Sequence, residues 1–373
     1  MEVWIRQSMP YRTQPGGPMP FPVPGWMWDR QLGEQLYSDR MKYMRRVDEL
    51  GFDGLIFTEH HYGPNGGLTP SPTVMLSAAT QVTERIKLVT MGIALALYPH
   101  PVRVAEELAM IDNLSHGRLV VGLISSGAQS LYAYGLSPTE EPSLYHEAYD
   151  LITRAWTEEN PFEWHSEHYN YECVSILPRP LQVPHPPVWT TAARAESLEW
   201  AAQHHIGLIA SGPTEQCAET LAYYQRYAEN ECGWTPTASD RGLAREFFLA
   251  PTMDEVDRVL GELVSHDRED AYPGRFEHPR LAELHKEKYT PRSYAYRSSR
   301  EHRRLGRSLE GQRQGAYLVG DPESMIEQIL EQQTACNANV LIIRPEMGHM
   351  SLDEVADRLD LFAREVLPAI RDA

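Results

Sequence analysis

Hydrophobic positions along the chain follow two patterns, short apolar runs and longer stretches in which apolar residues recur every three or four positions. The longer stretches follow most of the short runs. Between Leu36 and Leu50, for example, apolar side chains share one helical face, and Gly51 suits the end of that helix. The short runs predict eight strands, at residues 2–6, 55–58, 86–96, 119–124, 188–191, 206–210, 247–249 and 339–344. Strands that alternate with helices in this number, in a chain of 373 residues, predict an α/β fold, a (β/α)8 TIM barrel with insertions.

Three stretches lack this regularity and are predicted to be insertions, near residues 7–30, 159–187 and 266–314. The first holds six prolines between Gln7 and Trp28, which exclude a helix and a central strand there. The third is long and charged, and it precedes the eighth strand as a lid-like segment. Because no repeat and no linker divides the remainder, we expect a single domain over residues 1–373.

The composition narrows the function classes. Hydrophobic residues make up 42% and charged residues 23%, as in a globular protein with a substantial core. A net charge of −18 leaves no basic field for nucleic acid, and no apolar run approaches the ~20 residues that cross a bilayer. The N-terminus lacks a signal-peptide pattern, so we expect a cytoplasmic protein. The four cysteines, at positions 173, 217, 232 and 336, have no CxxC spacing and are expected to be reduced thiols.

Glu59, His60 and His61 follow the second predicted strand directly. Parallel α/β folds keep their ligands at the carboxyl ends of their strands, so these residues are expected at the catalytic rim. A histidine there can give or take a proton near neutral pH. A metal site is the competing interpretation, but adjacent histidines point in different directions and the chain has no HExxH motif, so no metal is expected. His165 and His168 are predicted to be surface residues.

Small residues follow three other strands. Ser125-Ser126-Gly127 and the turn with Ala193, Arg194 and Ser197 could seat a phosphate, because helix N-termini, hydroxyls and a guanidinium bind anions. Ordinary strand-to-helix turns have the same composition, which leaves a purely structural role open. Met91-Gly92-Ile93 places a glycine inside a strand, which indicates close approach by a flat ligand or by a packed helix.

Taken together and in order, these residues resemble the bacterial luciferase-like flavin-dependent monooxygenases. The resemblance covers almost the whole chain, and it rests on these segments: Gly51-Phe-Asp-Gly, Thr58-Glu-His-His, Arg85-Ile-Lys-Leu, 98–108, 112–122, Pro186-Pro-Val-Trp, 197–202 and Val319-Gly-Asp-Pro-Glu-Ser. It implies a (β/α)8 barrel that takes reduced FMN from a separate flavin reductase. It also implies reaction with O2 through a flavin hydroperoxide that oxygenates an organic substrate.

The resemblance also implies roles for single residues. His60 matches the catalytic histidine beside the flavin, and Glu59 would orient the site. Gly92–Ile93 falls where the family has a non-prolyl cis peptide against the flavin ring, which Met91 adjoins. The FMN phosphate is expected at Ser125, Ser126, Ala193, Arg194 and Ser197. Ser125 stands where luciferase has an arginine, and Ala193 where it has a glutamate.

The sequence therefore predicts a two-component monooxygenase that depends on reduced FMN. Its apolar rim favours a largely apolar substrate such as an aldehyde, ketone, terpenoid or polyketide; the rim consists of Met19, Phe21, Trp26, Trp28 and Tyr62. Nucleophilic and electrophilic oxygen transfer both stay open. The alternatives are a deazaflavin-dependent oxidoreductase on the same barrel and a non-catalytic flavin-binding protein. A homodimer is expected from the resemblance alone.

Overall fold

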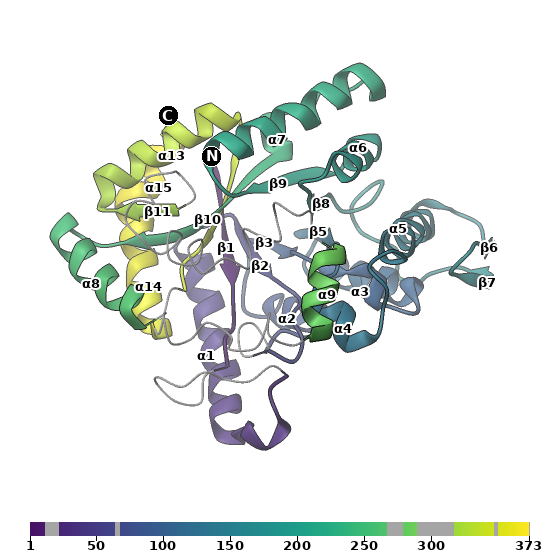
Figure 1. Ribbon diagram of the computed structural model, residues 1–373, viewed down its shortest axis with the longest axis horizontal. Coiled ribbons are helices and arrows are strands. Elements are labelled where there is room, and N and C mark those ends of the chain that lie inside the picture. Colours follow the sequence, from purple (N-terminus) through teal and green to yellow (C-terminus); the bar gives the residue numbers. More distant parts are fainter. Residues whose placement is uncertain (12–21, 64–67, 267–278, 289–316, 347–349, 373) are drawn as a thin grey trace.

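Eight parallel strands form a closed barrel in the part of the chain that the computed structural model describes, residues 1–11, 22–63, 68–266, 279–288, 317–346 and 350–372 (Figure 1). Each strand pairs with the next, and β12 pairs with both β10 and β1, which closes the ring. The predicted (β/α)8 barrel is confirmed. Its strands are β1 (Glu2–Gln7), β2 (Gly54–Phe57), β3 (Lys87–Thr90), β5 (Leu119–Ile124), β8 (Val188–Thr191), β9 (Gly207–Ser211), β10 (Arg241–Leu249) and β12 (Val340–Arg344).

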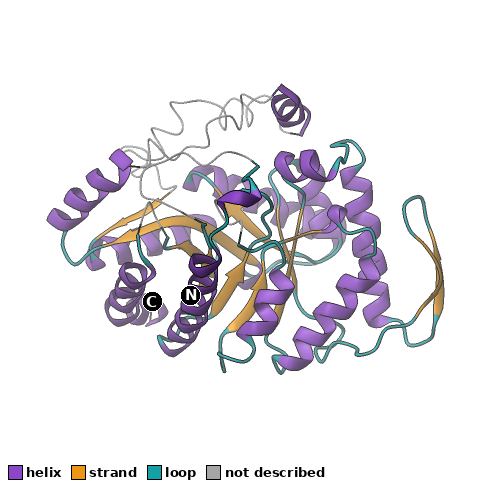
Figure 2. Cartoon of the chain, turned by 90° about the horizontal axis from the view of Figure 1, so that it is seen from below, coloured by secondary structure: helices purple, strands orange, loops and turns teal. Residues whose placement is uncertain are grey.

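Helices surround the strands on the outside (Figure 2). Their ends follow local capping rules: Asp29 accepts two backbone N–H bonds at the start of α1, and Ser351 with Glu354 forms a capping box at the start of α14. The longer helices are α1 (Arg30–Glu49), α2 (Pro72–Ala79), α3 (Pro101–Leu114), α5 (Glu141–Thr157), α6 (Ala195–Gln203), α7 (Thr214–Tyr227), α8 (Met253–His266), α9 (Pro279–Lys288), α13 (Pro322–Cys336) and α14 (Leu352–Leu361). The short ones are η1 (Gly25–Met27), η2 (Leu95–Leu97), α4 (Ala128–Tyr134), η3 (Ala228–Cys232), η4 (Ala238–Asp240), η6 (Phe362–Val366) and α15 (Leu367–Asp372).

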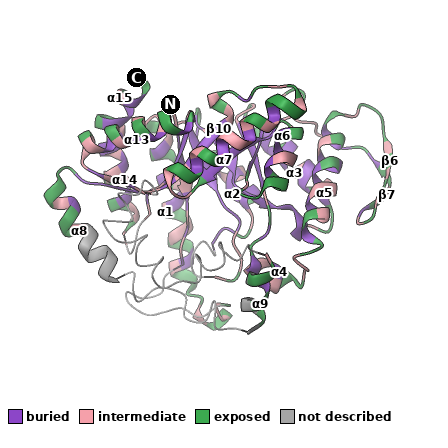
Figure 3. Cartoon of the chain, turned by 45° about the horizontal axis from the view of Figure 1, so that its top comes forward, coloured by how far each residue is buried: buried purple, intermediate pink, exposed green. Residues whose placement is uncertain are grey.

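The core has two parts, one between the strands and the helices and one inside the barrel. Figure 3 shows that buried residues concentrate on the central strands. The inner cluster draws side chains from every barrel strand, so it fills the interior; it contains Trp4, Ile56, Val89, Met91, Val120, Trp189, Ile209, Val340 and Ile342, with Ile124 and Ala244 packed against it. Gly54 and Gly207 leave room for the two indoles, since a Cβ would lie 2.5 Å from Trp4 and 2.6 Å from Trp189. A ligand must therefore bind above this layer, at the carboxyl ends of the strands.

The prediction of one continuous third strand over residues 86–96 is wrong. β3 ends at Thr90, a short strand β4 (Ile93–Ala94) pairs with β5, and η2 follows. The whole stretch is apolar, so hydrophobic periodicity has no signal for the break. The seventh strand begins at Arg241, six residues before the predicted 247–249. The prediction missed its first part because charged side chains interrupt the apolar run there.

The predicted insertions contain structure that periodicity missed. A hairpin of β6 (Phe162–His165) and β7 (Asn170–Val174) lies within residues 159–187 and stands out from the barrel (Figures 1 and 2). β11 (Tyr317–Gly320) adds to the carboxyl half of β10.

Most of the first insertion's centre, with Met19 and Phe21, lies outside the described residues, as does the expected lid over 266–314 apart from its first residue and α9. The four cysteines are free. Among the described helices, none has the length and apolar character to cross a membrane.

Candidate active site

Glu59 joins the end of β2 to the segment that follows β3. Its side chain is only 1% exposed, and one carboxylate oxygen lies 2.8 Å from His61 Nε2. The other oxygen accepts hydrogen bonds from the Tyr98 hydroxyl at 2.9 Å and from the Ala94 N–H at 3.2 Å. Burial, with a smaller contribution from Glu59, raises the pKa of Tyr98, so its hydroxyl keeps the proton that it donates. Glu59 is thus a buried acceptor with three partners.

His61 lies between Glu59 and an aromatic group at the mouth of the barrel. Its ring packs against Tyr62 and Tyr134, with ring centroids 5.8 and 5.2 Å away, and its Nδ1 lies 3.4 Å from the Tyr134 hydroxyl. Burial first, then Tyr62, raises the pKa of Tyr134 to about 12. His60, the predicted catalytic residue, is half-buried, and its backbone N–H donates to Thr69 O at 3.1 Å. Sequence analysis placed His61 at the same rim but named only Glu59 and His60 as catalytic, although His61 is the imidazole that pairs with Glu59.

The expected cis peptide lies one bond earlier than predicted, at Met91–Gly92 and not at Gly92–Ile93. The glycine is visible in the sequence, but no side-chain pattern tells which of its two peptide bonds is cis. A Cβ on Gly92 would lie 2.6 Å from Ile124 Cγ2 and 3.0 Å from Gly122 O. The close approach inferred from this glycine is therefore to β5, a neighbour that neither sequence interpretation named. Met91 lies in the inner cluster and Ile93 in β4, and both are buried.

The turn after β5 surrounds a buried ion pair that sequence analysis missed. Glu141, 2% exposed, lies 2.7 Å from Lys288 Nζ. The same ammonium donates to Ser125 Oγ at 2.7 Å, and the Ser126 N–H donates to Glu141 Oε1 at 2.7 Å. Ser126 Oγ is buried and has no hydrogen-bond partner within the described part of the chain. Lys288 ends α9, which packs on α4, in the stretch where the sequence showed no periodicity (Figure 1).

The turn after β8 reaches the same place through Lys288. Arg194 precedes the first turn of α6, and its guanidinium donates to the backbone carbonyl of Lys288. The Ser197 N–H donates to Arg194 O at 3.1 Å, while Ala193 and the Ser197 side chain are exposed. The structure thus connects Ser125 and Arg194, which the sequence placed in one site, by a residue that it did not predict. Two cations, a helix N-terminus and two hydroxyls form an arrangement suited to an anion.

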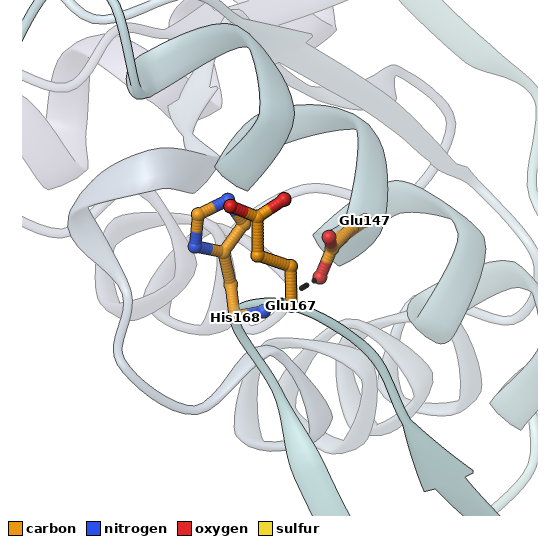
Figure 4. Close-up of side chains that lie close together, drawn as sticks. All are labelled: Glu147, Glu167 and His168. Atoms are coloured by element: carbon orange, nitrogen blue, oxygen red, sulfur yellow. Dashed lines mark hydrogen bonds between the residues drawn. The ribbon is translucent and has the colours of Figure 1, made fainter.

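Glu147, Glu167 and His168 form the candidate metal-ligand group of the described residues, with ligand atoms within 4.8 Å of one another (Figure 4). Hydrogen bonds already engage this group. His168 Nε2 lies 2.8 Å from Ser143 Oγ, and Glu147 accepts from Ser166 Oγ at 2.6 Å and from the His168 N–H at 3.1 Å. These bonds attach the hairpin to α5. His168 is half-buried, not the surface residue that was predicted, and the absence of a metal stays a prediction.

The chain resembles known proteins in sequence and in fold. A family profile described as luciferase-like monooxygenase matches residues 24–336. Identity is 30% over 181 residues to the oxygenase component of a flavin-dependent trigonelline monooxygenase from Acinetobacter baylyi, covering 47% of this chain and 49% of that protein. Identity is 26% over 344 residues to an F420-dependent glucose-6-phosphate dehydrogenase from Intrasporangium calvum, covering 87% and 92%.

Among solved structures, monooxygenase RslO1 from Streptomyces bottropensis superposes with a TM-score of 0.76 at 25% identity, over 99% of each chain. Several of the sequence matches cover less of the chain than this structural match does. The chain spans about half of the length of several curated relatives that it matches, the trigonelline monooxygenase component among them.

Proposed function

The chain belongs to the luciferase-like monooxygenase family, and from this premise we propose that it is the oxygenase component of a two-component system that uses reduced FMN and O2. The observation that carries the proposal is one barrel mouth with two parts. Glu59, His60 and His61 lie on one side, at the end of β2. Ser125 and Arg194 lie at the ends of β5 and β8, and Lys288 at the end of α9 contacts both of them.

The residues of the second part fit a flavin phosphate. Lys288 and Arg194 supply positive charge, the N-terminus of α6 supplies N–H dipoles, and Ser126 Oγ is a buried hydroxyl with bonding capacity left. Glu141 offsets one of these two positive charges, so the ion pair and Arg194 together leave a net positive charge for the phosphate. Bound there, reduced FMN would supply the reaction with O2 and the transfer of one oxygen atom to the substrate.

The chain's own groups would position and move protons. The Nε2 of His61 faces a carboxylate, so this nitrogen donates to it, while Nδ1 faces the Tyr134 hydroxyl. Glu59 holds this ring in place and also anchors Ala94, just after the Met91–Gly92 peptide. His60 would exchange a proton with the reacting groups at the rim. In this proposal Met91, Gly92 and Ile93 contact the flavin ring.

The decisive experiment supplies reduced FMN from a generic flavin reductase and measures substrate-dependent O2 consumption over a panel of organic substrates. His60→Ala should slow turnover while the affinity for FMN stays unchanged. His165→Ala, an exposed histidine of β6, is the matched control and should leave both quantities unchanged. Full turnover by the His60 variant would refute the role of His60, and no turnover with any substrate would favour a non-catalytic flavin-binding protein.

The second candidate is a deazaflavin-dependent oxidoreductase, favoured by the F420-dependent relative that matches over 87% of this chain. The same purified protein is therefore supplied with reduced FMN or with F420. If F420 supports hydride transfer and reduced FMN gives no O2 consumption, the deazaflavin-dependent function would replace the oxygenase proposal.

The proposal also covers the partner protein, the oligomeric state and the cellular location of this chain. The printed name of the trigonelline relative describes an oxygenase component, which supports a separate flavin reductase here too. We further propose a homodimer in the cytoplasm, which light scattering and cell fractionation test. The exposed side chains of Trp26, Trp28 and Tyr62 support a substrate with an apolar body.

A further inference from the structure

Three charged residues form a layer directly above the inner cluster of the barrel. Arg6 follows Trp4 by two positions, Arg344 follows Ile342 by two, and Glu246 follows Ala244 by two. Side chains two apart on a strand point to the same face, so all three face the barrel interior.

The register places these residues side by side. Glu246 of β10 is the partner of Arg344 of β12. Ile5 of β1 is the partner of Ile343 of β12, so the next residue of β1, Arg6, lies beside Arg344. On its other side β1 pairs with β2, where Arg6 is the partner of Ile56. The charged layer therefore borders the strand whose end carries Glu59 and His60.

The positive and negative charges of this layer, counted together with Glu346 and Arg40 beside it, do not balance. Arg344 Nε lies 2.8 Å from Glu246 Oε2, and Glu346, just after β12, pairs with Arg40 of α1. Each carboxylate thus has a cation of its own. Among the described residues, three guanidinium groups face two carboxylates, which leaves one positive charge. Arg6 is the arginine for which no ion pair is found among these residues, although Glu246 and Glu346 lie near enough to favour its charge.

Unpaired polar atoms gather at the same place. Of twelve buried side-chain atoms without a hydrogen-bond partner among the described residues, eight come from the ends of β1, β2 and β12 and from the facing side of α1. One of the eight, Arg344 Nε, is the atom that forms the ion pair with Glu246. The others include Arg6 Nε, Gln7 Nε2, Ser8 Oγ, Thr58 Oγ1 and Glu346 Oε2. Burial first, then the Arg344 guanidinium, lowers the pKa of Arg6, while Glu246 and Glu346 oppose this shift. A partly buried charge that shares its carboxylates with other arginines is costly, and so are buried polar atoms without partners; a bound anion would complete this group.

We propose that Arg6, with Arg344 beside it, binds a carboxylate of the organic substrate in the barrel mouth. The surplus of one charge matches a monoanion, and the planar fork of a guanidinium matches the two oxygens of a carboxylate. The inference rests on the proposed function in one respect, that this mouth is the substrate site. It narrows the predicted substrate from a largely apolar compound to an organic acid with an apolar body.

The test uses the full chain without flavin and measures ligand binding by the shift of the melting temperature. The probes are pairs that differ in charge: benzoate with benzamide, nicotinate with nicotinamide, and hexanoate with hexanamide. At least one acid should raise the melting temperature while its amide does not. Arg6→Gln should weaken binding of that acid about tenfold or more. Arg46→Gln changes an exposed arginine of α1 that pairs with Asp360 of α14; it is the matched control and should bind the acid as wild type does.

A second readout separates ligand binding from a structural role. Without ligand, Arg6→Gln should melt at or above the wild-type temperature, because it removes the surplus positive charge while Glu246 and Glu346 keep their ion pairs. Arg344→Gln should melt lower, because it leaves Glu246 alone. An equal loss in both variants would make Arg6 a structural ion-pair member and overturn the proposal. So would acids and amides that protect the wild type equally, or an Arg6→Gln variant that still prefers the acid.

Since no arm of this test contains flavin, it stands apart from the proposed function. Acid binding without FMN-dependent turnover would refute only the oxygenase, and turnover without a preference for acids would refute only the carboxylate site. If Arg6→Gln does not fold, Arg6→Lys decides: it keeps the charge but not the fork, so it should bind the acid more weakly than wild type. Binding at wild-type strength would overturn the proposal.

Discussion

Replacing Glu59 by glutamine should lower the free energy of unfolding by about 3 kcal/mol. The buried carboxylate makes three polar contacts, with Tyr98, Ala94 and His61. A hydrogen bond to a charged group contributes about 1.5–3 kcal/mol, and a neutral one about half as much. Glutamine keeps the shape but loses the charge and presents an NH2 in place of one acceptor. A loss of roughly 1 kcal/mol at each of the three contacts gives the predicted magnitude.

The measurement is equilibrium unfolding in urea, followed by circular dichroism and tryptophan fluorescence, in a double-mutant cycle with Tyr98→Phe. Because the two side chains share a buried hydrogen bond, we expect a coupling energy of about 1–2 kcal/mol. Tyr224→Phe is the matched control. Its hydroxyl is also buried and donates to Ile206 O at 2.7 Å, but it shares no partner with Glu59, so its effect should add to that of Glu59→Gln.

Two results would refute this reasoning. A loss below about 0.5 kcal/mol in Glu59→Gln is within the range of ordinary surface substitutions, and it would mean that the neighbours do not depend on the charge. Additive effects of Glu59→Gln and Tyr98→Phe would mean that the hydrogen bond between them contributes nothing to stability.

Three further predictions test other parts of the chain. Lys288→Met should weaken binding of FMN about tenfold but leave riboflavin, which lacks the phosphate, unchanged in a fluorescence titration; equal weakening of both would contradict a phosphate contact. Burial lowers the pKa of His146 from its usual 6.5, so the unfolded chain takes up the proton first as the pH falls. The stability from this group is present above pH 6.5 and lost below it, and His146→Gln should lose less stability than wild type between pH 8 and 5, by urea unfolding. Ser351→Ala removes the hydroxyl that caps α14 and should cost about 1 kcal/mol, seen as a lower urea midpoint with an unchanged slope.

Much of the scaffold could be predicted because its signals are local. The apolar runs located all eight barrel strands, and Glu59 with His60 was placed correctly at the end of β2. The errors fell where a local pattern was uniform or interrupted. The break after Thr90 lies inside an apolar run, and Arg241 and Arg245 hide the first half of β10.

The sequence by itself determined the order of strands and helices, since a period of two or of about 3.6 residues follows from backbone geometry alone. It also determined which residues stand at strand ends. Only the tertiary structure decided which of them meet. Closure of the barrel brings Lys288 to Ser125, 163 positions away, and sets Arg6 beside Arg344. Burial at those places, not residue type, gives a charged side chain its energetic weight, and burial depends on how the whole chain packs.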